Sequence, residues 1–467
     1  MKKNGFTLIE IIAVIALLGA IMLLVVPNIT KNFKDSKKRL FYDNVVSLYT
    51  SAGRSFLLLD NPSIKTFTNN GNVLDVDISE DIVYKIVVNS YGEVTSMYVA
   101  NGTYSYSKSN INGIKKKDIK IDDIIENGGL DTTPDIPSND GTLLNRILID
   151  NPTINTRTDF GTPFVTNTAN TLYKTAENGA DVYYFAGQDT ESTPINNWVK
   201  FGKNSSNQDL YWRIIRTNAD GSIRLLYHGT STTATDAYIG TSEFNTNYDS
   251  PKYVGYMYGD SDTTLEEART NANDSTIKAY IDNWYANNMT SYTKYLSTTA
   301  VYCNDRELAS GAKYSATGSE LYYAAHTKLY TNKTPTYDCT NDNDKFTVDA
   351  STGNGKLTYP IALMTADEIA YAGGVFELDA PMWYYTNSSL ESSTGTREWW
   401  SLSPDSWSGS AYSWYVLGSY GPGHLHIISV FNSLGVRPAI SLKSCIKYST
   451  GNGTASSPYE VQMDGGC

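Results

Sequence analysis

An apolar run over residues 6–26 constrains this chain more than any other feature. Thr7 and Glu10 are its polar members, and as a helix the run would be about 30 Å long, enough to cross a bilayer. A basic leader, residues 1–5, precedes it, and such a leader tends to stay in the cytoplasm. The sequence therefore predicts one membrane span over residues 6–26 with an N-in, C-out orientation, so that the long remainder lies outside the cell membrane on the extracytoplasmic side.

The residues around the start of this run carry a processing signal. An ordinary secretory signal has small residues after its apolar run, whereas Pro27 follows residues 23–26, which are Leu-Leu-Val-Val. Instead, residues 5–10, Gly-Phe-Thr-Leu-Ile-Glu, resemble the cleavage motif of type IV prepilins and pseudopilins. This resemblance implies that a prepilin peptidase cuts after Gly5 and that Phe6 becomes the N-methylated terminus.

Glu10 needs a partner on physical grounds. A carboxylate costs about 2.5–3.5 kcal/mol at the centre of a bilayer, and less toward the interface. The resemblance implies that Glu10 pairs with the free amino group of Phe6 in another pilin subunit, so the protein would assemble. The alternative is a plain anchor whose Glu10 reaches the interface.

A pilin-like head is expected after the span. The N-terminal helix is predicted to extend to residue 60 with an apolar stripe of Ile29, Phe33, Leu40, Val45, Leu48, Ala52, Phe56 and Leu59. Strands are predicted over residues 73–78, 82–89, 94–100 and 103–107, with Asn101-Gly102 as a hairpin turn. The head would cover residues 61–130, and a Pro/Ser/Asp/Gly-rich linker would cover residues 131–141.

Residues 142–467 are predicted to form a mixed domain. A short helix over residues 142–149 precedes strands over residues 181–187, 198–201, 210–216 and 222–227. Asp274 or Ser275 caps one helix, and Thr365 with Glu368 forms the capping box of another.

Several blocks of this region share a resemblance: residues 271–285, 302–306, 357–374, 399–404 (Trp-Trp-Ser-Leu-Ser-Pro) and 435–440 (Gly-Val-Arg-Pro-Ala-Ile). They resemble C-type-lectin-like domains related to formylglycine-generating and sulfatase-modifying proteins. The fold class expected for the whole chain is therefore α+β. A long transmembrane pilin helix and a small antiparallel sheet head would precede a large mixed C-type-lectin-like domain.

The stretch between the last two blocks is the candidate binding face. It is rich in Ser, Gly, Tyr and Trp, a composition typical of paratopes. The candidate ligand-binding residues are Asp405, Trp407, Tyr412, Trp414, Tyr420, His424, His426 and Phe431. The alternative is that its aromatic residues are sheet core, and for Trp399, Trp400, Trp414 and Val416 core and contact are equally expected.

No catalytic or metal motif is found in the sequence. The cysteines that the formylglycine-forming enzymes use are missing from residues 405–434, and no nucleophile, zinc or phosphate-loop motif occurs. We therefore expect neither an enzyme nor a cofactor or metal. The cysteines are Cys303, Cys339, Cys445 and Cys467, and 303 with 339 and 445 with 467 is the simplest of three pairings.

Charge and anchoring together indicate the class of function. The net charge is −12, and the acidic body disfavours nucleic acid as a ligand. We expect a minor or tip pilin, first in the cell membrane and then on the surface or pilus, that displays an adhesin domain for an extracellular glycan or protein. The alternatives are a pseudopilin of a secretion or DNA-uptake apparatus with a structural C-terminal domain, and an anchored surface binder that never polymerises.

Overall fold

The computed structural model divides the chain into two compact units, Met1–Asp140 and Gly141–Cys467, called here the smaller and the larger unit. It describes residues 34–58, 65–68, 73–79, 81–89, 91–101, 103–109, 113–126, 141–151, 153–164, 170–189, 194–234, 237–318, 320–379, 382–384, 398–418, 423–463 and 467. Gly5, Phe6, Glu10 and the expected span over residues 6–26 lie outside these ranges.

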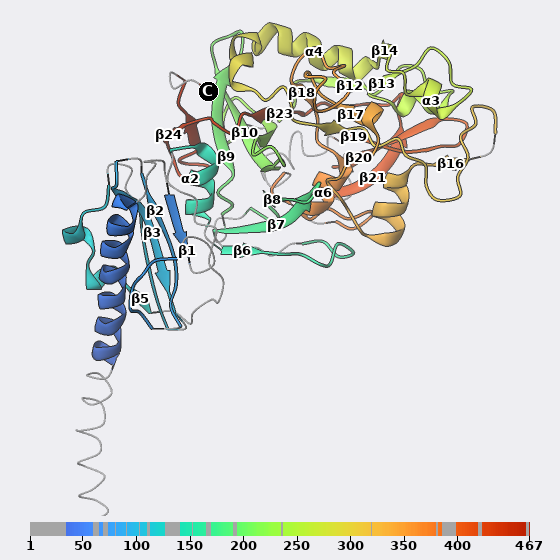
Figure 1. Ribbon diagram of the computed structural model, residues 1–467. Helices are drawn as coiled ribbons and strands as arrows, with labels where there is room; N and C mark the ends of the chain where they lie inside the picture. The colour runs from blue at the N-terminus through green and yellow to red at the C-terminus, as the bar shows by residue number, and fades with distance from the viewer. Residues whose placement is uncertain are drawn as a thin grey trace, which may run out of the picture. The chain divides into compact units, whose positions relative to one another are not determined.

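The smaller unit packs a helix over residues 34–57 against an antiparallel sheet (Figure 1). The sheet order is β1 (Lys65–Thr68), β2 (Val83–Val88), β3 (Val94–Ala100), β4 (Tyr104–Ser109) and β5 (Ile125–Glu126), with 3-10 turns η1 (Lys116–Asp118) and η2 (Ile121–Asp123) before the last strand. The strands expected over residues 82–89, 94–100 and 103–107 are thus confirmed as β2, β3 and β4. The strand expected over residues 73–78 is wrong, because residues 73–79 form no ladder.

The helix of the smaller unit buries one apolar stripe, Phe41, Val45, Leu48, Ala52 and Phe56, against the sheet. These positions are three or four residues apart, as one face of an α-helix requires. Leu40 was predicted in this stripe but is exposed. Phe41 takes its place because it lies one helical turn before Val45.

The predicted fold class is wrong for the residues that the structure describes. Strands predominate there, and the long helix over residues 34–57 carries Lys34, Asp35, Lys37, Lys38 and Arg39 in its first turns. Such charges would be costly in a bilayer. Within the described ranges, no helix has the length and apolar character that a membrane span requires.

The larger unit is built on two main sheets. The first contains, in order, β18 (Ile361–Leu363), β23 (Pro438–Leu442), β11 (Ile223–Gly229), β10 (Asp209–Thr217), β8 (Ala180–Tyr184), β7 (Thr171–Glu177) and β6 (Thr153–Asn155). A branch of this sheet starts at β10, which pairs with β9 (Trp198–Lys203); β9 pairs with β25 (Tyr459–Val461), and β25 pairs with β24 (Tyr448–Thr450). The second contains β12 (Thr241–Glu243), β22 (Ser433–Gly435), β19 (Trp399–Trp407), β20 (Ala411–Leu417) and β21 (His424–Ser429), with β16 (Leu321–Tyr322) paired to β19. The strands expected over residues 181–187, 198–201, 210–216 and 222–227 correspond to β8, β9, β10 and β11.

Helices and short ladders complete the larger unit. The helices are α2 (Leu143–Asp150), α3 (Leu265–Ala268), α4 (Thr276–Asn288), α5 (Ala324–His326) and α6 (Ala366–Ala372), with 3-10 turns η3 (Pro251–Val254), η4 (Thr290–Tyr295) and η6 (Asp342–Asp344) and a π-helix η5 (Thr327–Asn332). Two small ladders pair β13 (Met257–Tyr258) with β14 (Asn273–Asp274) and β15 (Tyr302–Cys303) with β17 (Lys345–Phe346).

The predicted helix caps are confirmed. Ser275 accepts a hydrogen bond from Lys278 N at the start of α4. Thr365 and Glu368 form the reciprocal capping box of α6, in which each side chain accepts a hydrogen bond from the other residue's backbone N–H. Gly373, at φ 122°, then ends α6 in a backbone conformation that glycine adopts without strain.

The core of the larger unit surrounds β19 and β20, which run side by side with β21 (Figure 1). All nine residues of β19 are buried. Other elements cover both faces of this strand, so buried and exposed residues do not alternate along it. Trp399, Trp400, Trp414 and Val416 are fully buried. The structure thus assigns these four residues to the core.

Two disulfides close loops of the larger unit, Cys303–Cys339 and Cys445–Cys467. They are the simplest of the three possible pairings. Disulfides persist in oxidising compartments such as the cell exterior.

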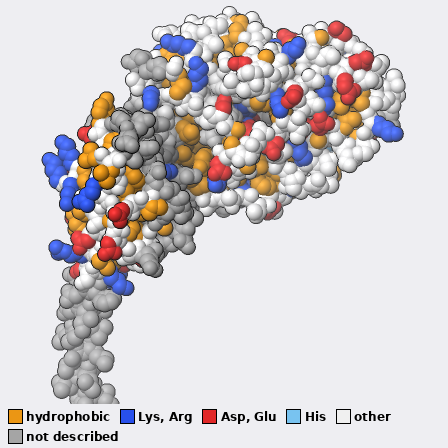
Figure 2. Space-filling model, viewed as in Figure 1, with side chains coloured by type: hydrophobic (Ala, Val, Ile, Leu, Met, Phe, Trp, Pro, Cys, Tyr) orange, Lys and Arg blue, Asp and Glu red, His pale blue; other side chains and the backbone are white. Residues whose placement is uncertain are grey.

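The visible surface of the larger unit is mostly uncharged, and Lys, Arg, Asp and Glu are scattered over it rather than gathered by sign (Figure 2). Binding to a phosphate backbone usually depends on a concentrated basic surface. The visible face does not have that pattern.

Candidate ligand-binding face

Five ring side chains form a continuous row on the larger unit, called here the aromatic row: Tyr322, His326, Tyr330, Phe376 and His426. Successive ring centroids lie 4.3, 5.0, 4.7 and 5.4 Å apart. These are the separations of rings in contact. Segments far apart in the chain therefore build one strip of rings.

The sheet and a helical segment hold the row in place. Tyr322 ends β16, and His326 and Tyr330 follow at steps of four residues in α5 and η5, so the latter two share one side of the helical segment. Phe376 follows the end of α6, and His426 lies on β21. Because β16 pairs with β19 and β21 pairs with β20, both ends of the row are fixed to the same sheet.

One part of the row is open to solvent. Tyr330 is 47% exposed, and Phe376 and His426 are half-buried. Two carboxylates lie at the same place: Glu377 is next to His426, and Asp379 is next to His424. Their side chains are 62% and 54% exposed. The open end therefore combines apolar ring surface with hydrogen-bond acceptors.

Three of the four histidines of the chain lie at this face, each next to a carboxylate. The pairs are His326 Nδ1 with Asp405 Oδ1 at 2.8 Å, His424 Nδ1 with Asp379 Oδ1, and His426 Nε2 with Glu377 Oε1 at 3.8 Å. A carboxylate next to an imidazole fixes the orientation of both side chains. The polar groups around the row are thus held in defined positions.

Three residues that contact the row carry buried polar atoms without partners in the described ranges. Among the described residues, Asp405 Oδ2, Trp414 Nε1 and His424 Nε2 have no hydrogen-bond partner. Asp405 bonds to His326 through its other oxygen, and the Trp414 ring lies 5.6 Å from that of Phe376. Buried polar atoms are normally satisfied by protein, water or a ligand, so this region has unused capacity for hydrogen bonds.

The backbone is strained on two sides of the open end. Lys333 and Glu377 have φ values of 53° and 56°, in the left-handed region that side-chain-bearing residues rarely adopt. The other non-glycine residues with positive φ in the described ranges are all asparagines, which tolerate that region better. At Lys333 this conformation ends η5, as it does at many helix C-termini, and at Glu377 it is the kind of strain that some binding sites contain.

Charge around the row is mixed. Lys333 Nζ lies 5.7 Å from the ring centroid of Tyr330 and 5.9 Å from that of Phe376, and burial lowers the pKa of this lysine although Glu377 opposes the shift. A hydrogen bond with Glu320, together with burial, raises the pKa of Tyr322 to about 12. The Tyr322 hydroxyl is therefore neutral at physiological pH.

The predicted ligand-binding residues divide into three groups. His426 belongs to the aromatic row and is partly exposed, whereas Asp405, Trp414 and His424 contact members of the row and are buried. Trp407 is buried and Tyr412 is half-buried. Phe431 is exposed and packs on Tyr248 with centroids 4.8 Å apart, without contact to the row. Tyr420 lies outside the described residues.

Four row residues were missed by the sequence reasoning: Tyr322, His326, Tyr330 and Phe376. The spacing of the first three at steps of four residues was a usable signal, because it places rings on one side of a helix. Phe376 gave no such signal, since the fold alone brings it next to Tyr330 and His426.

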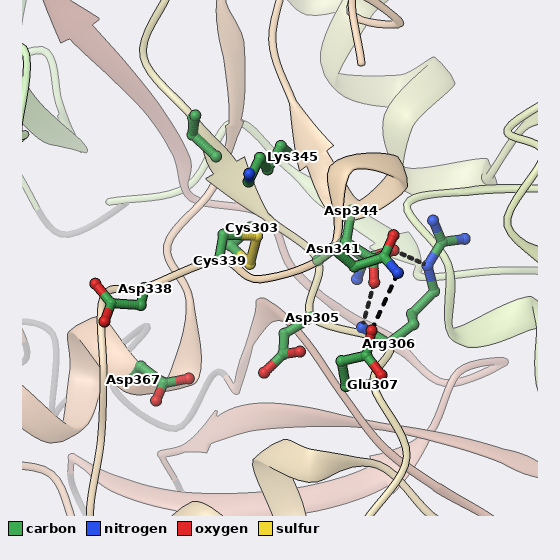
Figure 3. Close-up of a disulfide and its surroundings, with 12 residues drawn as sticks. Cys303, Asp305, Arg306, Glu307, Asp338, Cys339, Asn341, Asp344, Lys345 and Asp367 are labelled. Atoms are coloured by element: carbon green, nitrogen blue, oxygen red, sulfur yellow. Dashed lines mark hydrogen bonds and ion pairs between the residues drawn. A yellow bond between two sulfur atoms is a disulfide. The ribbon is translucent and has the colours of Figure 1, made fainter. Parts of the chain in front are cut away.

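A second group of charged side chains surrounds the Cys303–Cys339 disulfide (Figure 3). Asp305 and Asp367 point toward the same space, and Lys328 Nζ lies 2.8 and 3.3 Å from their carboxylates. Burial alone would lower the pKa of Lys328, but Asp367 and Asp305 raise it above its ordinary value. A lysine held in its charged form is a poor general base, and the adjoining cavity of about 20 Å³ has room for about one water. We therefore assign this group a structural role.

Metal binding has no support in the parts of the chain that the structure describes, where no group of three or more His, Cys, Asp or Glu side chains is placed to hold an ion. Comparisons with protein-family models, with curated proteins and with solved structures give no match.

Proposed function

We propose that this protein is a surface subunit whose larger unit binds an extracellular ligand through the open end of the aromatic row. One observation carries this proposal. Tyr330, Phe376 and His426 present partly exposed rings, and the row contacts Asp405, Trp414 and His424, whose buried polar atoms lack a partner among the described residues. Rings with nearby polar groups of fixed orientation are the usual components of a binding face.

Binding is favoured over catalysis by how the charged groups are used. The hydrogen bonds of the histidines at the row go to Asp405, Asp379 and a backbone carbonyl, and not to a Ser, Thr or Cys side chain that could act as a nucleophile. Near the Cys303–Cys339 disulfide, Lys328 is held as a cation between two acids. Neither arrangement pairs a nucleophile with a free general base.

Display of the larger unit rests on the prepilin-like sequence. Gly5 and Phe6 would be processed by a prepilin peptidase in the cell membrane, and Glu10 would pair with Phe6 of another pilin subunit. The two disulfides support export, because such bonds are rare in the cytosol. In this proposal the subunit is a minor or tip pilin with an adhesin role.

A binding screen with the full-length protein in detergent tests this function. The probes are neutral glycans, acidic glycans and extracellular proteins, and we expect the wild type to bind at least one of them. The double variant Tyr330→Ala/Phe376→Ala should lose this binding because it removes the exposed ring surface. The matched control, Tyr248→Ala/Phe431→Ala, removes the exposed ring pair outside the row and should bind like the wild type.

Two other results of this screen would contradict the proposal. A folded wild type that binds none of the probes would favour the pseudopilin alternative, in which the larger unit is structural. Equal binding by the row variant would place the ligand elsewhere on the molecule.

A further inference from the structure

We propose that the open end of the aromatic row binds a neutral glycan, with a pyranose ring packed against the exposed ring surface of Tyr330 and Phe376 and its hydroxyl groups bonded to the surrounding polar side chains. This inference rests on the proposed function and names the chemical class of its ligand.

The shape of the row suits a chain of rings better than a compact ligand. Its members follow one another with centroid separations of 4.3 to 5.4 Å, so the row is a strip and not a cage. Tyr330 and Phe376 meet almost at right angles, at 85°, and Phe376 lies nearly parallel to His426, at 28°. An elongated ligand could therefore contact more than one ring along the strip.

The rim has the polar groups that a sugar needs. A pyranose has an apolar C–H face and an edge of hydroxyl groups, so it requires a ring surface and nearby hydrogen-bond acceptors and donors together. Glu377 and Asp379 supply exposed acceptors. Lys333 supplies a donor beside the rings of Tyr330 and Phe376. Hydrogen bonds to ionised groups are about twice as strong as those between neutral groups.

These rim groups are positioned before any ligand arrives. Asp379 bonds to the buried His424, and Glu377 lies next to His426. The backbone N–H of Glu377 also donates to Leu425 O on β21, which ties the rim to the sheet. A rim fixed in this way loses less conformational freedom on binding, and that increases affinity.

Charge disfavours an anionic glycan. Four carboxylates lie near the row, those of Glu320, Glu377, Asp379 and Asp405. The lysine beside its rings is Lys333. Sulfated, phosphorylated or sialylated glycans would be repelled by this excess of negative charge.

Equilibrium binding of the full-length protein to neutral polysaccharides, namely glucans, galactans and mannans, tests this proposal. We expect the wild type to bind at least one of them. Phe376→Ala should weaken that binding about tenfold or more, as the loss of a central aromatic contact does, whereas Phe376→Tyr should restore it because the ring is kept. Asp379→Asn and Glu377→Gln should weaken binding without changing the thermal midpoint.

Controls separate this proposal from the proposed function. Phe431→Ala and Asp342→Asn change an exposed ring and an exposed carboxylate away from the row and should bind like the wild type. Row-dependent binding to acidic glycans or to proteins, with none to the neutral polysaccharides, would overturn the glycan assignment and leave the binding function intact. Absence of binding to every probe, by a folded protein, would overturn both.

Discussion

Replacing Glu368 with glutamine is expected to lower the free energy of unfolding of the larger unit by about 3–5 kcal/mol. The Glu368 side chain is 1% exposed and accepts hydrogen bonds from Arg216 Nε at 2.8 Å and Arg224 Nη1 at 3.0 Å. Removal of its charge leaves Arg216 with Glu177 as an ion-pair partner and takes away the carboxylate that pairs with the buried Arg224. Chemical denaturation monitored by tryptophan fluorescence measures the change.

The matched control is Glu460→Gln, because Glu460 pairs with Lys200 at the surface. Surface ion pairs contribute little to stability, so this variant should unfold almost like the wild type. Equal destabilisation by both variants would contradict the assignment of Glu368 as the buried anchor of this network.

Acid should reduce the difference between wild type and Glu368→Gln. Burial alone would raise the pKa of Glu368, but Arg224 and Arg216 outweigh burial and hold the pKa below its ordinary value of 4.5. A group with a lowered folded-state pKa contributes stability that is present above the unfolded pKa and is lost as the pH falls through the folded pKa. The two unfolding curves should therefore converge below about pH 4.5.

Asp344→Asn is expected to have a similarly large effect, again about 3–5 kcal/mol. Asp344 is fully buried, and its carboxylate lies 2.7 Å from Arg306 Nε and 3.3 Å from Arg269 Nη2. Both arginines are buried, so the substitution leaves two desolvated cations without a full counter-charge. Thermal unfolding followed by circular dichroism measures the loss.

Asp342→Asn is a control on the same 3-10 turn. Asp342 pairs with Lys345, but its side chain is 91% exposed, and exposed pairs add little to stability. The substituted side chains, Asp342 and Asp344, differ mainly in burial. If Asp342→Asn destabilised the protein as much as Asp344→Asn, burial would not be the cause of the effect.

Local sequence signals predicted local structure well. Ser275 and the Thr365–Glu368 pair gave the starts of α4 and α6, because a helix cap depends on residues within one turn. Strand β3 has the predicted bounds, since Asn101 and Gly92 mark the turns on either side. The apolar stripe predicted for the long helix included Leu40 where the structure buries Phe41, because these two adjacent apolar residues fit the helical period almost equally well.

The candidate face could be predicted in part. Trp414, His424 and His426 were found together because β20 and β21 are neighbouring strands close in sequence. Tyr330 and Phe376 reach the same place through the packing of η5 and the loop after α6, which no local pattern encodes. The burial of Asp405 and Trp414 could not be predicted either, because it depends on the distant segments that cover both faces of β19 and β20.

Hydroxyl-radical footprinting of the full-length protein, with and without a bound neutral polysaccharide, tests the aromatic row as the contact surface most directly. We predict that the ligand protects Tyr330, Phe376 and His426 from oxidation and leaves Tyr248 and Phe431 unchanged. Protection of Tyr248 and Phe431, with Tyr330 and Phe376 still oxidised as in the free protein, would contradict the account.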